Sequence, residues 1–174
     1  MKKILIVIDM QNDFVTGGLG SERALAAAAN ARKKIENYSR DGHKIIFTRD
    51  THYENYLETL EGKNLPVPHC IAGTDGREIY GGLDAGCRGA LYVDKDTFGW
   101  RGWRETLDGL IDDDTEIELV GLCTDICVVS NALILKCLYP ENRIAVDASC
   151  CAGVTEASHE AALLTMRMCQ IEII

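Results

Sequence analysis

The sequence predicts an α/β protein with a doubly wound, six-stranded parallel sheet that carries helices on both faces. Short apolar runs rich in Ile, Val and Leu recur along its 174 residues, and segments with helical spacing lie between most of them. Near-continuous apolar strands alternating with helices are typical of parallel sheets, because crossover helices bury both faces. A chain of this length is sufficient for one domain with a full core.

The apolar runs predict the six strands. Each run is short enough for a strand, and right-handed crossovers would join successive strands into one parallel sheet. The expected strands are 3–8 (KILIVI), 44–48 (KIIFT), 90–93 (ALYV), 116–121 (EIELVG), 143–146 (RIAV) and 170–174 (QIEII).

Four of the intervening segments have the apolar spacing of helices. These expected helices cover residues 21–40, 101–110, 124–138 and 155–168. Residues 49–89 are the exception, a long polar loop with two prolines and little periodicity. A loop of this length in a compact domain is usually functional. We therefore expect a single domain over 1–174 with a functional loop insertion at about 49–89.

The composition narrows the classes of partner. A formal net charge of −9 argues against a general nucleic-acid or anionic-membrane binder, so a small molecule is the expected partner. No apolar run approaches the roughly 20 residues of a membrane span, and the first run breaks at Asp9 without a cleavage site of small residues. We expect a cytoplasmic protein whose eight cysteines are reduced thiols rather than disulfides.

Polar residues follow the expected strands, where ligands bind in open α/β sheets. Cys127 falls near the start of a helix if Thr124 or Asp125 caps it, and free N–H groups there would lower the pKa of the thiol. Asp9 and Lys95, after two other strands, would supply a base and a positive charge for a nucleophilic thiol. The alternative is that Cys127 is a buried structural cysteine.

The long loop holds a second constellation. Asp50, His52 and His69 form a set of ligands suited to Zn²⁺, Mn²⁺ or Fe²⁺, and Glu61, Glu58 or Glu54 could add a further ligand. The alternative is that these are ordinary surface-loop histidines.

Five motifs together resemble the isochorismatase-like cysteine hydrolases, most closely the nicotinamidase branch. They are DMQNDF (9–14), RDTH (49–52) with PHCIAGTDG (68–76), VDKDTFG (93–99), LVGLCTDICV (119–128) and DASCCAGVTEASHEAAL (147–163). The resemblance implies a Cys127, Asp9 and Lys95 catalytic triad. It also implies a cis peptide bond between Leu122 and Cys123, which would orient the backbone N–H groups of Cys123 and Cys127 as an oxyanion hole.

The same resemblance implies a metal, most simply Zn²⁺, held by Asp50, His52, His69 and Glu61. In the nicotinamidase branch the metal binds the pyridine nitrogen, and aromatic residues sandwich the ring. Three positions depart from the residues usual there: Thr51 replaces tryptophan, Cys123 replaces alanine, and Ile126 replaces tyrosine or valine. The residues expected to contact the substrate are Phe14, Trp100 and Leu122.

The expected function is therefore hydrolysis of a small amide through a thioester, most simply nicotinamide to nicotinate and ammonia in NAD salvage. The resemblance also suggests a homodimer or homotetramer. One alternative is an amidase of the same superfamily that acts on a carbamoyl or ureido compound. The other is a redox-sensing protein in which Cys123 and Cys127 form a reversible disulfide.

Overall fold

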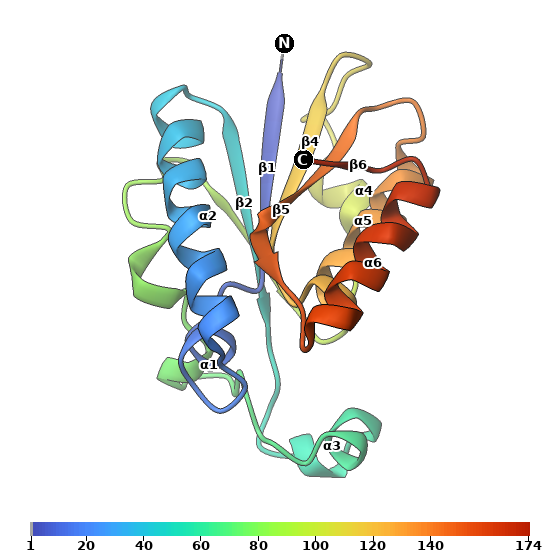
Figure 1. Ribbon diagram of the computed structural model, residues 1–174. Coiled ribbons are helices and arrows are strands. Elements are labelled where there is room, and N and C mark those ends of the chain that lie inside the picture. Colours follow the sequence, from blue (N-terminus) through green and yellow to red (C-terminus); the bar gives the residue numbers. More distant parts are fainter. Residues whose placement is uncertain (1) are drawn as a thin grey trace.

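A computed structural model describes residues 2–174 and contains one six-stranded sheet (Figure 1). All its strand pairs are parallel, in the order β3-β2-β1-β4-β5-β6. The strands are β1 (Lys3–Ile8), β2 (Lys44–Asp50), β3 (Leu91–Lys95), β4 (Glu116–Leu122), β5 (Ile144–Ala152) and β6 (Glu172–Ile173). The doubly wound fold expected from the apolar runs is confirmed, and the strand order reverses between β1 and β4.

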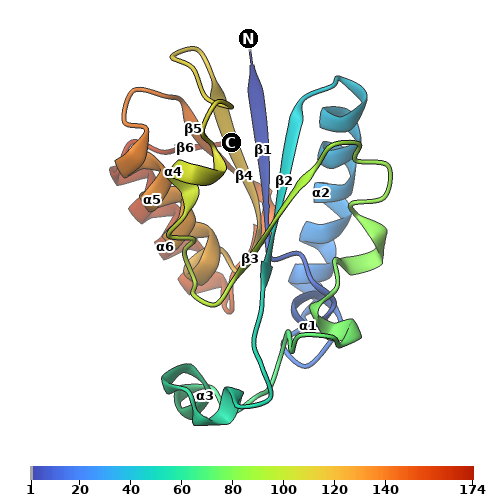
Figure 2. The ribbon, with the colours of Figure 1, turned by 180° about the vertical axis from the view of Figure 1, so that it is seen from behind.

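Helices cover both faces of the sheet. One face carries α1 (Asn12–Val15) and α2 (Glu22–Arg40), and the other carries α4 (Trp103–Thr106), α5 (Val129–Leu138) and α6 (Glu156–Met168) (Figures 1 and 2). Two apolar clusters fill the spaces between the sheet and these layers. Neither face of the central strands is left to solvent, which explains why β1 is buried from Ile4 to Ile8.

The helix α2 begins and packs for local reasons. Its N-cap is Ser21, whose Oγ accepts a hydrogen bond from the backbone N–H of Ala24 at 3.1 Å. Its buried face consists largely of alanines, namely Ala24, Ala27, Ala28 and Ala31. Small side chains let the helix lie close to the sheet, which places its first turn beside the carboxyl ends of the strands.

Two of the expected helices differ in the structure. The segment 101–110 forms only the short α4: its C-cap is Leu107, and Gly109 just beyond has a φ of 68°, in the left-handed region that a continuing α-helix does not use. The segment 124–138 starts with one π-type turn, Thr124–Val128, before α5 begins.

The long loop after β2 is not structureless. It contains α3 (Leu60–Asn64) and short 3₁₀ turns at Tyr56–Glu58, Asp75–Arg77 and Tyr80–Gly82. Figures 1 and 2 show α3 projecting beyond the carboxyl ends of the strands, away from the body of the sheet. No helix within residues 2–174 is long and apolar enough to cross a membrane.

Candidate active site

The three expected catalytic residues meet at the carboxyl ends of the strands. Asp9 follows β1, Lys95 ends β3, and Cys127 lies in the turn after β4. The Lys95 Nζ atom lies 2.6 Å from Asp9 Oδ2 and 3.7 Å from the Cys127 sulfur. All three side chains are buried. The structure therefore brings together a thiol, a carboxylate and an ammonium group that are far apart in sequence.

Asp9 is held by its own backbone and by Thr48 of β2. Its φ of 46° lies in the left-handed region, which turns the chain sharply at the end of β1. Thr48 Oγ1 donates a hydrogen bond to Asp9 Oδ1 at 2.6 Å and accepts one from the Asp9 N–H at 3.1 Å. The other oxygen, Oδ2, contacts the Lys95 ammonium but has no aligned hydrogen-bond donor within residues 2–174. That oxygen is the one open to a proton from the site.

Burial decides the protonation of the thiol. It raises the pKa of Cys127 well above the usual value, and Asp9 raises it further while Lys95 opposes both. Burial also raises the pKa of Asp9, against the lowering effect of Lys95. Burial alone would lower the pKa of Lys95, but Asp9 and Cys127 raise it above its usual range. These directions favour a neutral thiol at Cys127 and a protonated ammonium group at Lys95.

The sequence predicts a lowered pKa for the Cys127 thiol. That prediction depends on a helix that is capped by Thr124 or Asp125 and begins just before Cys127. Neither residue is a cap: the Cys123 carbonyl accepts hydrogen bonds from the N–H groups of Ile126 and Val128 instead. Thr124 Oγ1 is hydrogen-bonded to His159 Nδ1 at 2.8 Å, and Asp125 accepts from the Val154 N–H. The peptide bond between Leu122 and Cys123 is cis.

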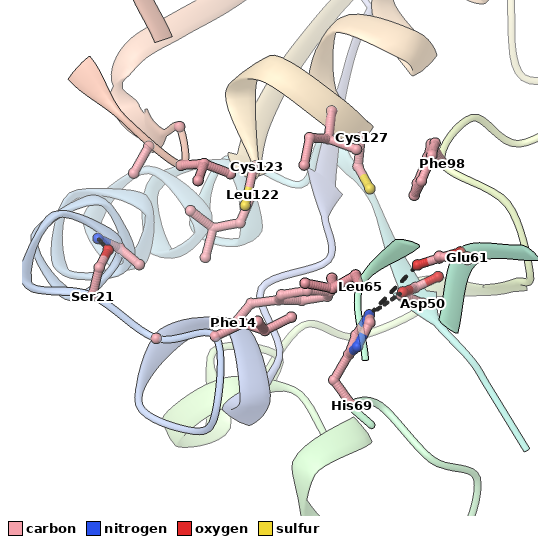
Figure 3. Close-up of a pocket in the computed structure, with 17 residues that line it drawn as sticks. Phe14, Ser21, Asp50, Glu61, Leu65, His69, Phe98, Leu122, Cys123 and Cys127 are labelled. Carbon is pink, nitrogen blue, oxygen red and sulfur yellow. Dashed lines mark hydrogen bonds and ion pairs between the residues drawn. The ribbon is translucent and has the colours of Figure 1, made fainter. Parts of the chain in front are cut away.

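A second cluster lies next to the first. Asp50, His52, Glu61 and His69 each offer a ligand atom, and these atoms all lie within 4.8 Å of one another. His52 Nε2 lies 3.0 Å from Asp50 Oδ2 and 3.5 Å from Glu61 Oε1. His69 Nε2 lies 3.6 Å and 3.7 Å from the same two oxygens. Figure 3 shows Asp50, Glu61 and His69 pointing toward one another.

The donor atoms of this cluster fit a divalent cation. His69 Nδ1 is hydrogen-bonded to the Val67 carbonyl at 2.8 Å, so the ring's Nε2 lone pair faces the carboxylates. Two imidazole nitrogens and two carboxylate oxygens around one point suit Zn²⁺, Mn²⁺ or Fe²⁺. Glu58 and Glu54, the other candidate ligands in the loop, lie outside the group of four.

Without an ion, the charges of the cluster act on one another. Burial lowers the pKa of His52, but hydrogen bonds and charges from Asp50 and Glu61 outweigh it and raise the pKa to about 9. Burial would raise the pKa of Asp50, but His52, His69 and Lys95 hold it well below its usual range. In the absence of a cation, Asp50 and Glu61 therefore favour the protonated form of His52, whose positive charge balances theirs.

Gln11 and Asp13, which were not expected at the site, hold the backbone of this cluster in position. The Gln11 side chain accepts a hydrogen bond from the Asp50 N–H at 2.7 Å and donates to the Asp50 carbonyl at 2.9 Å. Asp13 Oδ2 accepts from the Cys70 N–H at 2.7 Å, directly after His69. The signal for both is in DMQNDF, where polar residues follow a buried strand.

A cavity of about 410 Å³ joins the two clusters (Figure 3). Phe14, Leu122 and Cys123 lie in its wall together with Cys127. Trp100 does not, although the sequence predicts it there: its indole N–H donates to Thr106 Oγ1 at 2.9 Å, and its ring lies against Gly102. Phe98, two residues earlier, lines the cavity instead. The other lining residues are Leu19, Gly20, Ser21, Ala24, Asp50, Glu61, Leu65, His69, Ile126, Ala152, Gly153 and Val154.

Comparison with known proteins gives consistent matches over the full chain. A family model described as isochorismatase domain matches residues 3–174. The chain is 27% identical to a nicotinamidase/pyrazinamidase of Mycobacterium tuberculosis, over 99% of this chain and 98% of that protein. It is 30% identical to an uncharacterized isochorismatase family protein of Bacillus subtilis, over 94% and 93%. A crystal structure of a pyrazinamidase/nicotinamidase from Streptococcus mutans superposes with a TM-score of 0.87 at 28% identity, covering 99% of this chain and all of that one.

Proposed function

The chain belongs to the isochorismatase domain family and is an amidohydrolase, and from this premise we propose that it hydrolyses a small neutral carboxamide, nicotinamide foremost. The observation that carries the proposal is the contact of Lys95 with both Asp9 and Cys127, the last of which lines an apolar cavity. Three of the four candidate metal ligands, Asp50, Glu61 and His69, also line this cavity. The similarity to a nicotinamidase/pyrazinamidase along almost the whole chain supports this choice of substrate.

In the first half-reaction Asp9 accepts the thiol proton of Cys127, and the sulfur attacks the amide carbonyl carbon. A base is required because burial keeps the pKa of the thiol high. The backbone N–H groups of Cys123 and Cys127 hold the oxyanion, and one such donor is commonly worth about 3 kcal/mol. When the C–N bond breaks, Asp9 returns the proton to the departing nitrogen, which leaves as ammonia.

In the second half-reaction water attacks the thioester carbonyl. Asp9 takes a proton from that water, the C–S bond breaks, and the proton passes to the sulfur, which restores the thiol and releases the carboxylic acid; the acid then loses its proton to solvent. Lys95 keeps its proton throughout, because Asp9 and Cys127 raise its pKa. Its fixed charge stabilises the carboxylate and the thiolate as each forms.

Asp50, His52, Glu61 and His69 would hold a divalent cation, most simply Zn²⁺. When bound, the cation supplies a Lewis-acid site for a pyridine nitrogen. Phe14, whose ring centre lies 5.3 Å from that of His69, offers an apolar face beside this point.

The walls of the cavity weigh against the alternatives. Its lining includes no lysine or arginine and is largely apolar, which favours a ring amide over a more polar carbamoyl or ureido compound. For the redox alternative, burial raises the pKa of Cys123 to about 12 and that of Cys127 also lies well above its usual value. Oxidation proceeds from thiolates, so this pair is poorly suited to sensing peroxide at neutral pH.

The direct test is ammonia release from nicotinamide by the purified protein and by Cys127→Ala. We expect the substitution to abolish turnover, and Cys137→Ala, at an exposed thiol, to retain it. Wild-type turnover in Cys127→Ala would refute the nucleophile. A protein that releases no ammonia from nicotinamide but does so from an N-carbamoyl compound would favour the ureido alternative.

A further inference from the structure

The cavity extends well past the point of reaction. Figure 3 shows Cys127 and Phe98 toward one end, together with the candidate metal ligands Asp50, Glu61 and His69. Ser21, the N-cap of α2, lies toward the other end. We call this second end the α2 compartment; it is formed by Leu19, Gly20, Ser21, Ala24, Gly153 and Val154. The whole cavity, at about 410 Å³, lies within the range of roughly 300–1,000 Å³ typical of sites for drug-sized ligands. A single-ring amide held between Cys127 and His69 would leave the α2 compartment empty.

Small side chains at Ala24, and at Ala152 next to Gly153, leave room for the α2 compartment. Ala24 of α2 and Ala152 at the end of β5 are buried in the same apolar cluster as Phe14 and Leu122. A longer side chain at position 24 would project into this space. The Ser21 hydroxyl, the polar side chain of the compartment, accepts a hydrogen bond from the Ala24 N–H as the helix cap and keeps its own O–H group to donate.

Among the residues that line the cavity, charged side chains occur only at the end near Cys127. Among the residues of the lining, the charged groups are Asp50 and Glu61, with His69 between them. The α2 compartment has no ionisable side chain of its own. Arg23, whose guanidinium donates a hydrogen bond to the Val154 carbonyl at 2.8 Å, lies outside the lining. An apolar substituent in the α2 compartment would be transferred from water onto an apolar surface.

We propose that the substrate class is neutral carboxamides that carry an apolar substituent, with the amide at Cys127 and the substituent in the α2 compartment. The proposal rests on the proposed amidase function and adds to it the shape and polarity of the substrate. It implies that nicotinamide fills only part of the site, and that Ala24 sets the size of group accepted.

The test compares nicotinamide with derivatives that carry a methyl, ethyl or propyl group at each free ring carbon in turn. Binding is measured by calorimetry on Cys127→Ala, in which the amide is not consumed, and kcat/KM is measured on the wild-type enzyme. We expect one ring position at which each added methylene tightens binding, by at most about three- to fourfold, the value for fully burying one CH₂ group, because Gly20, Ser21 and Val154 leave the compartment open to solvent. At that position kcat/KM should rise or hold.

A pair of variants on α2 locates the effect. Ala24→Leu fills the α2 compartment and should lower kcat/KM for the propyl derivative at least about tenfold more than for nicotinamide. Ala29→Leu adds the same side chain at an exposed position of the same helix and should change neither. Circular dichroism and thermal unfolding identify a variant that fails to fold, in which case the wild-type and Cys127→Ala series still decide.

The outcomes separate the two proposals. If affinity and kcat/KM fall with substituent size at every ring position while nicotinamide is hydrolysed, the substrate class is wrong and the amidase function stands. If the derivatives bind more tightly with each methylene but no amide is cleaved, the apolar compartment is supported and the amidase function fails.

Discussion

The carboxylate of Asp50 lies 3.6 Å from the ammonium group of Lys95, through its Oδ1 atom. Its other oxygen, Oδ2, faces His52 and His69. One side chain at the end of β2 therefore joins the candidate metal site to the catalytic cluster. A change at the metal site should consequently alter the charge beside Lys95 as well as metal affinity.

Removing one proposed metal ligand should empty the site. We expect His52→Ala to bind Zn²⁺ at least about tenfold more weakly than the wild type, because outer-shell partners alone are worth 10–100-fold. Elemental analysis after dialysis measures the metal content. His43→Ala, outside the group of four, is the matched control, and equal metal in both variants would exclude His52 from the site.

Metal binding should release protons. The pKa of His52 is raised to about 9 in the absence of metal, so at about pH 7.5 the ion must displace roughly one proton per chain. Calorimetry in two buffers of different ionisation enthalpy counts these protons. Apparent affinity should increase with pH up to about 9 and then level off, and a pH-independent affinity would contradict the raised pKa.

The same shift fixes the sign of a stability effect in the metal-free protein. A histidine whose pKa is higher when folded than its unfolded value of about 6.5 stabilises the fold most below that value. This contribution is lost as the pH rises through about 9. Urea unfolding of the metal-free wild type should therefore show a loss of stability between these pH values that His52→Ala lacks.

Gln11 should act on the metal site through Asp50. Gln11→Leu removes the partners of the Asp50 N–H and carbonyl, and each buried group left unpaired costs about 1–3 kcal/mol. We expect lower stability in urea and weaker Zn²⁺ binding together. Asn30→Leu, which removes an exposed hydrogen bond to Ser149, should change neither by a comparable amount.

Asn131 ties the loop after β3 to the turn that carries Cys127. Its Oδ1 accepts from the Trp100 N–H and the Trp103 indole, both at 2.8 Å, and its amide donates to the Phe98 and Cys127 carbonyls. Asn131→Leu should destabilise the fold by at least about 2 kcal/mol, because several buried groups lose partners at once. Denaturant unfolding measures this loss, and a change below 0.5 kcal/mol, the usual range for surface sites, would contradict it.

Alkylation should report the raised pKa of Cys127. The thiolate is the reactive form, so the rate of modification at Cys127 should increase about tenfold per pH unit and still be rising at pH 9. Peptide mapping after timed iodoacetamide treatment measures this rate, with the exposed Cys169 as internal control. A rate at Cys127 that levels off near pH 7 would show the low thiol pKa that the helix-start argument predicts.

The sequence predicts the strands well because each has a short run rich in Ile, Val and Leu, and β1 matches to the residue. Its errors lie where tertiary contacts decide. β5 runs on to Ala152, far past the expected end at 146, because Cys151 and Ala152 pair with Gly121 and Leu122 beyond a register shift. The helix expected at 101–110 is only the four-residue α4. Its first residue, Trp103, donates a hydrogen bond from its indole to Asn131.

At the site, too, the sequence predicts some features and only the packed structure shows the others. Strand ends and motifs predict which residue types gather, and the structure does gather Asp9, Lys95 and Cys127. The direction of the Cys127 pKa shift depends on burial, a property of the packed chain that no local pattern contains. Phe98 takes the place expected for Trp100 for a similar reason: both follow β3, and only packing determines which ring turns toward the cavity.

The position of Lys95 on β3 has a consequence for how activity would be lost. β3 is an edge strand of the sheet and pairs only with β2, whereas Asp9 and Cys127 follow the two central strands, β1 and β4. Edge elements can open locally without global unfolding, and hydrogen exchange detects such openings. Detachment of β3 alone would leave a folded core with no ammonium beside Asp9. Mild denaturant should therefore inactivate the enzyme before its central strands lose protection from exchange.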